Sequence, residues 1–315
     1  MNSGIPFTVI GGYLGTGKTT LVNHILRHSA GRRFALLIND FGSINIDAEL
    51  IEGEDGDVIN LANGCICCTL AAGFAVAINT ILQQDPLPDH VIVEASGVSD
   101  PNKIAPYGHV PGLSLDGVIV VVDAETVRAR ARDKYVGRTV LQQLGSADIL
   151  ILNKTDLVGT EEKQAVYEWL AQAAPRSRII EAIYGAVPLE FLLGPDAGRD
   201  LKQVSEEIEQ DHRHAAQFAT WSYVGEVPLQ RQAFERFVRG LPASVVRAKG
   251  VLNLRGEPER RMIFQLAGQR WSLAPGRPWG AEKPQTRIVG IGISEQFEQD
   301  DLLAALEICA HPGSE

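Results

Sequence analysis

The sequence lacks the features that mark membrane, secreted and nucleic-acid-binding proteins. Its 315 residues contain no apolar run long enough to span a bilayer, and the first residues lack the basic stretch and apolar core of a secretion signal. Basic residues are also in deficit, because 29 Lys and Arg against 39 Asp and Glu leave a net charge of −10. Such a chain has no diffuse attraction to nucleic acid or to an anionic membrane. We therefore expect a cytoplasmic protein that binds neither nucleic acid nor a membrane. Any phosphate that it binds must be held by a local binding site.

Cysteine is scarce as well, with four residues in the whole chain, which argues against a disulfide framework. Three of the four are Cys65, Cys67 and Cys68. Such closely spaced thiols without a secretion signal indicate metal or redox chemistry. The fourth, Cys309, lies in an expected helix and is expected to belong to the core.

What the sequence does contain is an ordinary globular composition, with 45% hydrophobic and 22% charged residues. Over the first 200 residues, short apolar runs alternate with longer helical patterns, which predicts an α/β fold with a mostly parallel sheet flanked by helices. The expected strands are short and β-branched: Phe7–Ile10, Phe34–Ile38, Val91–Val93, Val118–Val122 and Ile149–Leu152. Three of them end in a polar residue, Glu94, Asp123 or Asn153, at the edge where such sheets bind ligands.

Two helices and a loop are expected between these strands. The helices cover about residues 18–28 and 69–84, and the polar stretch of residues 41–63 is expected to be a functional loop.

A second, smaller α+β domain is expected after a change of texture near residue 200. We assign residues 1–200 to the first domain, 201–217 to a linker and 218–315 to the second domain. Its expected strands are Phe218–Tyr223, Val251–Leu254, Met262–Leu266, Trp271–Leu273 and Thr286–Ile293, and its expected helices are Leu229–Arg239 and Asp301–Cys309.

A glycine-rich loop follows the first expected strand. Residues 12–19 are G-Y-L-G-T-G-K-T and fit G-x-x-x-x-G-K-S/T before an expected helix. In such a loop backbone N–H groups surround phosphates, the lysine reaches the β and γ oxygens, and the hydroxyl binds Mg²⁺. The pattern predicts a nucleoside triphosphate site formed by Gly12, Gly15, Thr16, Gly17, Lys18, Thr19 and Thr20.

The base is predicted from N-K-T-D at residues 153–156, directly after an expected strand. The carboxylate of Asp156 can accept both the N1–H and the N2–H of guanine, whereas adenine offers no such donor pair. Asn153 can hold the loop and the base, and Lys154 can lie over the ring. GTP is therefore expected rather than ATP.

The hydrolytic residues are less explicit in the sequence. Glu94 ends a strand and precedes Gly97, whose N–H can approach the γ-phosphate. We expect Glu94 and Asp40 to join Thr19 around Mg²⁺, or to orient the attacking water. A capping role is the alternative for both carboxylates. No arginine finger can be named, so slow intrinsic turnover is expected.

The thiol cluster precedes an expected helix, and a helix N-terminus lowers a thiol pKa. Thiolates bind Zn²⁺, Co²⁺ or Cu⁺, but three sulfurs on so short a segment leave a tetrahedral shell incomplete and open to a partner's ligand. The alternatives are buried inert cysteines and a redox pair.

With the phosphate loop, C-I-C-C, E-A-S-G and N-K-T-D in one chain, the sequence resembles the CobW-type family of metal-handling GTPases. These are relatives of the nickel-insertion GTPases that serve urease and hydrogenase. The likeness extends to residues 234–237, 247–250 and 268–273. It implies a P-loop NTPase domain followed by a CobW C-terminal-like domain.

The resemblance implies a GTP-hydrolysing metallochaperone. Cys65, Cys67 and Cys68 would hold Zn²⁺ or Co²⁺ and pass it to a client apo-metalloprotein, and two copies of the chain can pair as a homodimer. Residues 39–42 would form the first switch and 94–97 the second. Two features depart from the family: Ser43 replaces a common glutamate, and the histidine-rich linker is reduced to residues 211–214, with His212 and His214.

Two other functions share these motifs. One is a GTP-dependent regulatory switch whose thiols only sense metal, and the other is a nucleotide hydrolase with a redox thiol pair. For the leading function we expect coupling, because the segment that follows Asp40 leads to the thiols, so that γ-phosphate contacts would order the metal site.

Overall fold

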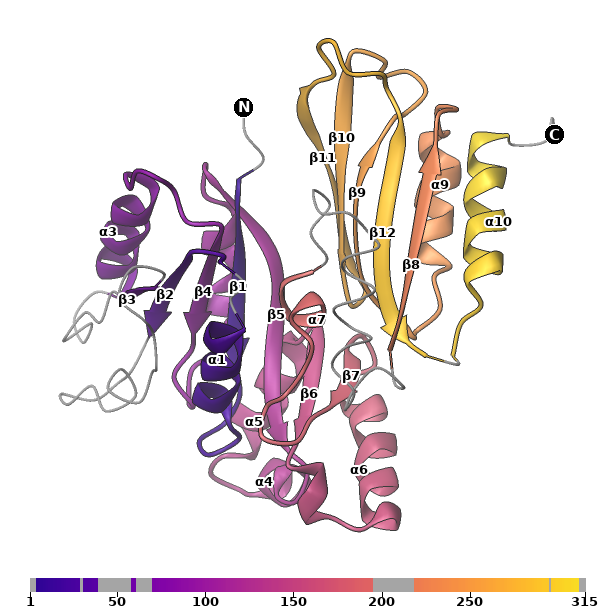
Figure 1. Cartoon of the computed structure of the whole chain (residues 1–315). Coiled ribbons are helices and arrows are strands. Elements are labelled where there is room, and N and C mark those ends of the chain that lie inside the picture. Colours follow the sequence, from indigo (N-terminus) through magenta and orange to yellow (C-terminus); the bar gives the residue numbers. More distant parts are fainter. Residues whose placement is uncertain are drawn as a thin grey trace. The chain divides into compact units, whose positions relative to one another are not determined.

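Two units make up the part of the chain that is described, residues 4–28, 31–38, 58–60, 70–194, 218–294 and 296–311 of a computed structural model. Contacts divide the chain after Val187, so that one unit is Gly4–Val187 and the other contains Pro188–Glu315 (Figure 1). Within the described ranges, no helix has the length and apolar character needed to cross a membrane.

The first unit contains a seven-stranded sheet in which every pair of neighbours is parallel. Its order is β3-β2-β4-β1-β5-β6-β7. The strands are β1 (Ile5–Gly11), β2 (Phe34–Ile38), β3 (Val58–Asn60), β4 (His90–Glu94), β5 (Leu113–Asp123), β6 (Ile149–Asn153) and β7 (Arg178–Glu181). The predicted parallel sheet is therefore confirmed.

Helices bury both faces of this sheet. Its helices are α1 (Lys18–Arg27), α3 (Leu70–Leu82), α4 (Val127–Arg132), α5 (Gly137–Ser146) and α6 (Thr160–Ala173). In β2, Ala35 and Leu37 belong to the core cluster that α3, α5 and α6 cover, whereas Leu36 points to the other face and is equally buried. Continuous apolar strands are what this double burial requires.

Two strands of the first unit differ from the predictions. β3 lies in the stretch of residues 41–63 that was expected to be a loop, and it pairs with β2 through Ala35 and Ile59. β7 was not predicted, because only Ile179 and Ile180 are apolar in it. The helices predicted at 18–28 and 69–84 are present as α1 and α3.

The second unit contains a five-stranded antiparallel sheet in the order β11-β10-β9-β12-β8. Its strands are β8 (Phe218–Gly225), β9 (Val245–Leu252), β10 (Arg260–Ala267), β11 (Arg270–Pro278) and β12 (Thr286–Ile293). Its helices are α9 (Arg231–Arg239) and α10 (Gln299–Ala310), whose apolar residues pack on the same core as Trp221 and Phe264. The α+β prediction is confirmed, and the strand expected at Val251–Leu254 begins earlier, at Val245.

The short helix α7 (Leu189–Leu193) belongs to the second unit. The fully buried side chain of Arg247 donates hydrogen bonds to the carbonyl oxygens of Phe191 and Leu192, and Lys249 Nζ donates to Leu193 O at 2.7 Å. These bonds attach α7 to β9. The two units therefore divide between Val187 and Pro188, before the boundary predicted at residue 200. The predicted linker, residues 201–217, lies outside the described residues.

Candidate nucleotide site

The glycine-rich loop lies between β1 and α1, as predicted. Gly17 is the residue before α1 and has a φ of 103°, which L side chains rarely adopt. A Cβ there would also collide with Nδ2 of Asn153. Because the first N–H groups of α1 have no partner within the helix, the loop and the helix N-terminus together suit a phosphate group.

Lys18 and Thr16 both direct polar atoms at the carbonyl of Tyr13. Lys18 Nζ lies 3.4 Å from Tyr13 O, and Thr16 Oγ1 donates to the same oxygen at 2.9 Å. Lys18 is only 8% exposed although it carries a charge. Its ammonium therefore lies back along the loop, where a phosphate would meet it.

Thr19 and Glu94 come together although 75 positions separate them. Thr19 Oγ1 donates to Glu94 Oε1 at 3.2 Å, and Glu94 is buried at the end of β4. A hydroxyl and a carboxylate are the oxygen donors that Mg²⁺ prefers, so the pair fits that ion. Asp40, the other expected magnesium ligand, lies outside the described residues.

The segment after β4 packs closely on the loop. A Cβ on Gly97 would approach the backbone nitrogen of Leu14 to 2.9 Å, so only glycine fits this close approach. Gln143 Nε2 on α5 donates to the carbonyl oxygens of Gly97 at 3.1 Å and Ser99 at 2.9 Å. The expected second switch is thus held from the side of α5.

Asn153 connects the base motif to the phosphate loop. Its Nδ2 donates to Thr16 O at 2.9 Å, and its Oδ1 accepts the N–H of Gly185 at 2.9 Å. Asp156 is exposed in the 3₁₀ helix Thr155–Leu157 that follows β6, open to a ligand. The amide of Asn153 therefore orders three segments of the site.

Lys154 adds a second connection. Its Nζ donates to Gly15 O at 2.8 Å and forms an ion pair with Asp123 Oδ2 at 2.8 Å. Its backbone is left-handed, with a φ of 62°. The N-K-T-D pattern predicts a base-binding role for Lys154, but it contains no sign of the ion pair with Asp123.

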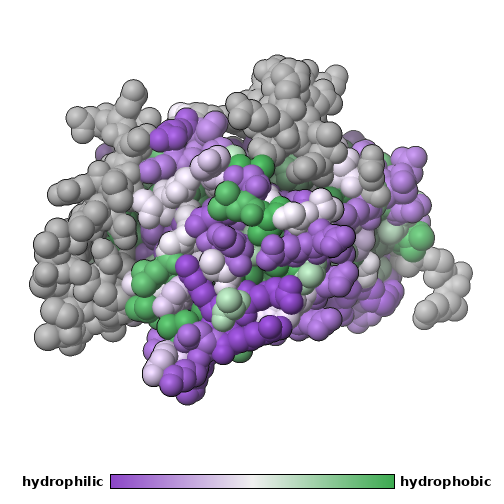
Figure 2. Space-filling view, turned by 90° about the horizontal axis from the view of Figure 1, so that it is seen from below, coloured by the Kyte–Doolittle hydropathy of each residue, from purple (hydrophilic) through white to green (hydrophobic). Residues whose placement is uncertain are grey.

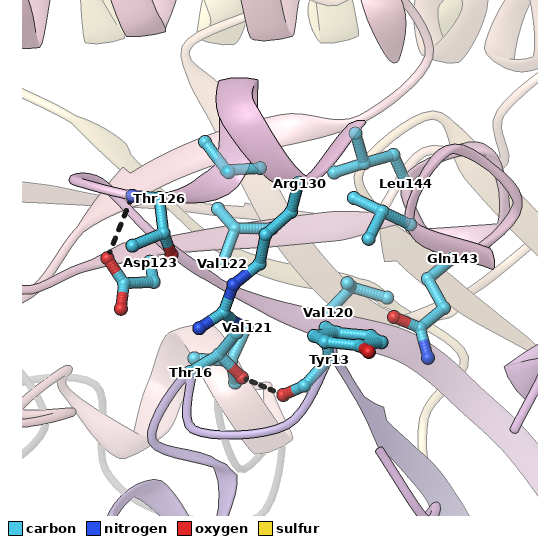
Figure 3. A pocket seen from close by; sticks show the side chains of 12 residues that line it. Tyr13, Thr16, Val120, Val121, Val122, Asp123, Thr126, Arg130, Gln143 and Leu144 are labelled. Atoms are coloured by element: carbon cyan, nitrogen blue, oxygen red, sulfur yellow. Dashed lines mark hydrogen bonds between the residues drawn. The ribbon is translucent and has the colours of Figure 1, made fainter. Parts of the chain in front are cut away.

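Arg130 on α4 is a further residue that sequence reasoning missed. Its Nη1 donates to Leu14 O at 2.6 Å, and its guanidinium carbon lies 5.2 Å from the centre of the Tyr13 ring. Figure 3 shows the side chain reaching from α4 toward the loop, beside a cavity of about 10 Å³. That volume accommodates at most one water molecule, so the cavity is not a ligand site.

The strands of the larger sheet run downward in Figure 1, so Figure 2, seen from below, faces their carboxyl ends. Hydrophilic residues cover most of the described surface in that view, and the hydrophobic patches are small.

The predicted thiol site lies outside the part of the chain that the structure describes. Cys65, Cys67, Cys68, Ser43, His212 and His214 lie outside the described residues. Among the residues that are described, no three His, Cys, Asp or Glu side chains form a group able to hold a metal ion. Cys309 is buried as expected, and burial raises its thiol pKa, so it remains protonated and inert.

Comparison with protein families decides what kind of protein carries this site. The family model described as CobW/HypB/UreG, nucleotide-binding domain, matches residues 6–181. The chain belongs to the CobW/HypB/UreG family. A second model, the cobalamin synthesis protein cobW C-terminal domain, matches residues 218–310. The resemblance drawn from the motifs is confirmed, together with a P-loop nucleotide-binding domain and a CobW C-terminal domain.

Several curated relatives match this chain over nearly its whole length. The zinc chaperone CobW of Sinorhizobium sp is 32% identical, over 93% of this chain and 94% of the relative. The zinc chaperone YjiA of Escherichia coli is 31% identical, over 96% and 97%. The zinc-regulated GTPase metalloprotein activator 1 of Dictyostelium discoideum is 27% identical, over 94% and 73%.

Among solved structures, the Zn(II)-bound YjiA GTPase from E. coli aligns with 98% of this chain and 99% of its own. The TM-score is 0.45 and the identity 23%.

Proposed function

We propose that this protein hydrolyses GTP and uses the nucleotide state to load and deliver a metal ion, as a GTPase metallochaperone. The observation that carries the proposal is the connection of N-K-T-D to the phosphate loop through Asn153 and Lys154. Family membership and relatives named as zinc chaperones and GTPases support it.

The protein binds GTP through the loop of residues 12–20. Backbone N–H groups and Lys18 neutralise the phosphates, and Gly97 lies close enough to the loop to supply a further N–H. Asp156 accepts the two guanine N–H groups. Lys154 lies against the base, and Asn153 joins the base motif to the phosphate loop through its hydrogen bond to Thr16 O.

Thr19 and Glu94 would hold Mg²⁺, which when bound offsets the negative charge of the β and γ phosphates. Glu94, or Asp40, orients the attacking water. Arg130 binds a carbonyl of the loop, on the side opposite to the N–H of the same peptide group, so it does not serve as an arginine finger. We therefore propose slow turnover in the isolated protein.

The cargo is a metal ion held by the thiolates of Cys65, Cys67 and Cys68. Zn²⁺ is favoured by the names of the relatives, and Co²⁺ is the second candidate because the same thiolates accept it. The ion passes from this open site to a client apo-metalloprotein. Contacts of the γ-phosphate order the segment between Asp40 and the thiols, and hydrolysis releases it.

The test of this coupling compares Zn²⁺ affinities with GDP and with a non-hydrolysable GTP analogue. Linkage requires that metal change GTP affinity by the same factor as GTP changes metal affinity. We expect a difference of about tenfold or more between the two nucleotides. Equal affinities would contradict the coupling, and Cys67→Ser should remove the metal while nucleotide binding remains.

Delivery is tested by mixing the loaded protein with an apo-metalloprotein in the presence of GTP or GDP. Zn²⁺ should move with one nucleotide and not with the other. If it stays on the protein in both, the chain is instead a regulatory switch whose thiols sense metal. Lys18→Ala should abolish nucleotide binding or turnover, and full GTPase activity in that variant would contradict the nucleotide site itself.

A further inference from the structure

The end of β5 carries a buried carboxylate that the proposed function does not use. Asp123 is 3% exposed, and its Oδ2 lies 2.8 Å from Lys154 Nζ. Its Oδ1 accepts the backbone N–H groups of Glu125 at 3.0 Å and Thr126 at 3.2 Å. We propose that Asp123 is a positioning residue for guanine nucleotides, which holds Lys154 of the base motif against the phosphate loop. The proposal rests on the proposed GTP site.

The negative charge of Asp123 has one evident purpose. A neutral asparagine would accept the N–H groups of Glu125 and Thr126 equally well. Burying a carboxylate costs free energy unless a cation compensates it. The cation at hydrogen-bond distance is Lys154, whose side chain is 34% exposed and therefore reaches from the buried carboxylate to the ligand side. The charge is explained by Lys154 and not by the turn.

Lys154 is held in a conformation that it would not adopt by itself. A left-handed backbone is unfavourable for a lysine, and ordering a lysine side chain costs rotamer entropy. The ion pair with Asp123 and the bond to Gly15 O offset these costs before any nucleotide arrives. The base consequently meets a lysine that is already positioned.

A second series of hydrogen bonds connects the Asp123 carboxylate to the same loop, through α4. Asp123 accepts the N–H of Thr126, the residue that precedes α4 (Figure 3), and Arg130 of α4 donates to Leu14 O. Two cations thus bind the successive carbonyls of Leu14 and Gly15. In a trans peptide the C=O and the following N–H point in opposite directions, so the N–H of Gly15 faces away from Arg130, whereas the N–H of Thr16 donates to Tyr13 O at 3.4 Å. Through α4 and Arg130, Asp123 thereby also contributes to aiming the N–H of Gly15.

The test replaces Asp123 by asparagine, which keeps the shape and the two accepted N–H bonds but removes the charge. We expect dissociation constants for GDP and a GTP analogue to rise about tenfold, with kcat at saturating GTP within about twofold. Lys154→Met should raise them to a similar extent. The double variant should be no worse than Lys154→Met alone, because both changes remove one interaction.

Asp148→Asn is the matched control. Asp148, which directly precedes β6, is also buried. It accepts the N–H of Val118 at 2.8 Å, and Val118 belongs to β5, the strand of Asp123, but lies away from the loop. This variant should leave nucleotide affinity unchanged whatever it does to stability. Urea unfolding of each nucleotide-free variant separates the two effects.

Two results would overturn the proposal. In one, Asp123→Asn lowers stability but leaves nucleotide affinity intact, which would make Asp123 a capping residue only. In the other, the affinity losses of Asp123→Asn and Lys154→Met multiply in the double variant. If Asp123→Asn fails to fold, the comparison of Lys154→Arg with Lys154→Met decides: only arginine keeps a cation for Asp123, so Lys154→Arg should lose less nucleotide affinity than Lys154→Met, and equal losses would overturn the proposal. Failure of the GTP site itself would show differently, as absent guanine-nucleotide binding in the unaltered protein.

Discussion

At the residue scale, the base motif and the phosphate loop form one hydrogen-bonded unit. Asn153 bonds to Thr16 and Gly185, and Lys154 bonds to Gly15. Side chains that hold one another in this way transmit a disturbance in one loop to the other. Small changes in the phosphate loop should therefore affect the base site.

Gly17 provides a test with a matched partner in the same loop. Gly17→Ala combines an unfavourable φ with a collision at Asn153, whereas Gly15→Ala has the unfavourable φ of 73° but no neighbour within 4 Å. We expect Gly15→Ala to lower the free energy of unfolding by about 1 kcal/mol and Gly17→Ala by about 3 kcal/mol. Urea unfolding of the nucleotide-free proteins measures both. Equal losses would show that Asn153 moves away freely.

Which residues of the site were predictable depended on how far apart their partners lie. Gly12–Thr19 and N-K-T-D are local patterns whose spacing already specifies phosphate and base chemistry. The partners of these patterns are distant: Arg130 lies 116 positions from Leu14, and Asp123 lies 31 from Lys154. Only the order of strands in the sheet brings such pairs together, and a single sequence does not contain that order.

At the scale of elements, hydrophobic pattern predicted the strands that are buried on both faces. β5 and β6 are runs of Val, Ile and Leu, which parallel central strands require. β3 and β7 lie at the two edges of the sheet, where fewer apolar residues are needed, so each has a weak pattern. The central strands were predicted and the edge strands were not, because the prediction depends on how many buried apolar residues a strand contains.

The packing of β8 against α10 gives a pH prediction. Burial, and then the neighbouring Glu307 carboxylate, raise the pKa of Tyr223 to about 12 from its ordinary value of 10.0. The folded protein therefore favours the neutral phenol, and the resulting stability, complete below pH 10, is lost as pH rises toward 12.

Unfolding at increasing alkaline pH should show this loss, and Tyr223→Phe should reduce its slope. Tyr135→Phe is the control, because Tyr135 is 79% exposed and lies in the other unit. An unchanged slope in Tyr223→Phe would contradict the assignment.

At the scale of the whole molecule, the boundary between the units determines which fragments can fold. A fragment of residues 188–315 keeps α7 on β9, whereas one of residues 218–315 removes the carbonyls that Arg247 and Lys249 bind. We expect the longer fragment to be the more stable one, because the shorter one also exposes the apolar surface that Phe191 covers.

Arg247→Leu distinguishes the two fragments further. It should cost about 3 kcal/mol in residues 188–315, where it leaves buried carbonyls without donors. In residues 218–315 it should cost within about 1 kcal/mol, since the guanidinium has already lost those partners and is hydrated. Denaturant unfolding measures both, and equal costs would mean that α7 does not stabilise the second unit through Arg247.

The edge strand β3 and the helix α3 have a consequence for the proposed metal cargo. β3 ends at Asn60, paired in the sheet, and α3 begins at Leu70 and buries Phe74 and Ile78 in the core. Residues 61–69, which carry Cys65, Cys67 and Cys68, are therefore joined to a described element at both ends. Because the three thiols lie within four positions of one chain, each would be at a high effective concentration for a metal ion held by its neighbours. In the proposed metallochaperone, a metal ion that leaves one sulfur would meet the next before it escapes, so a client would have to compete with rapid recapture.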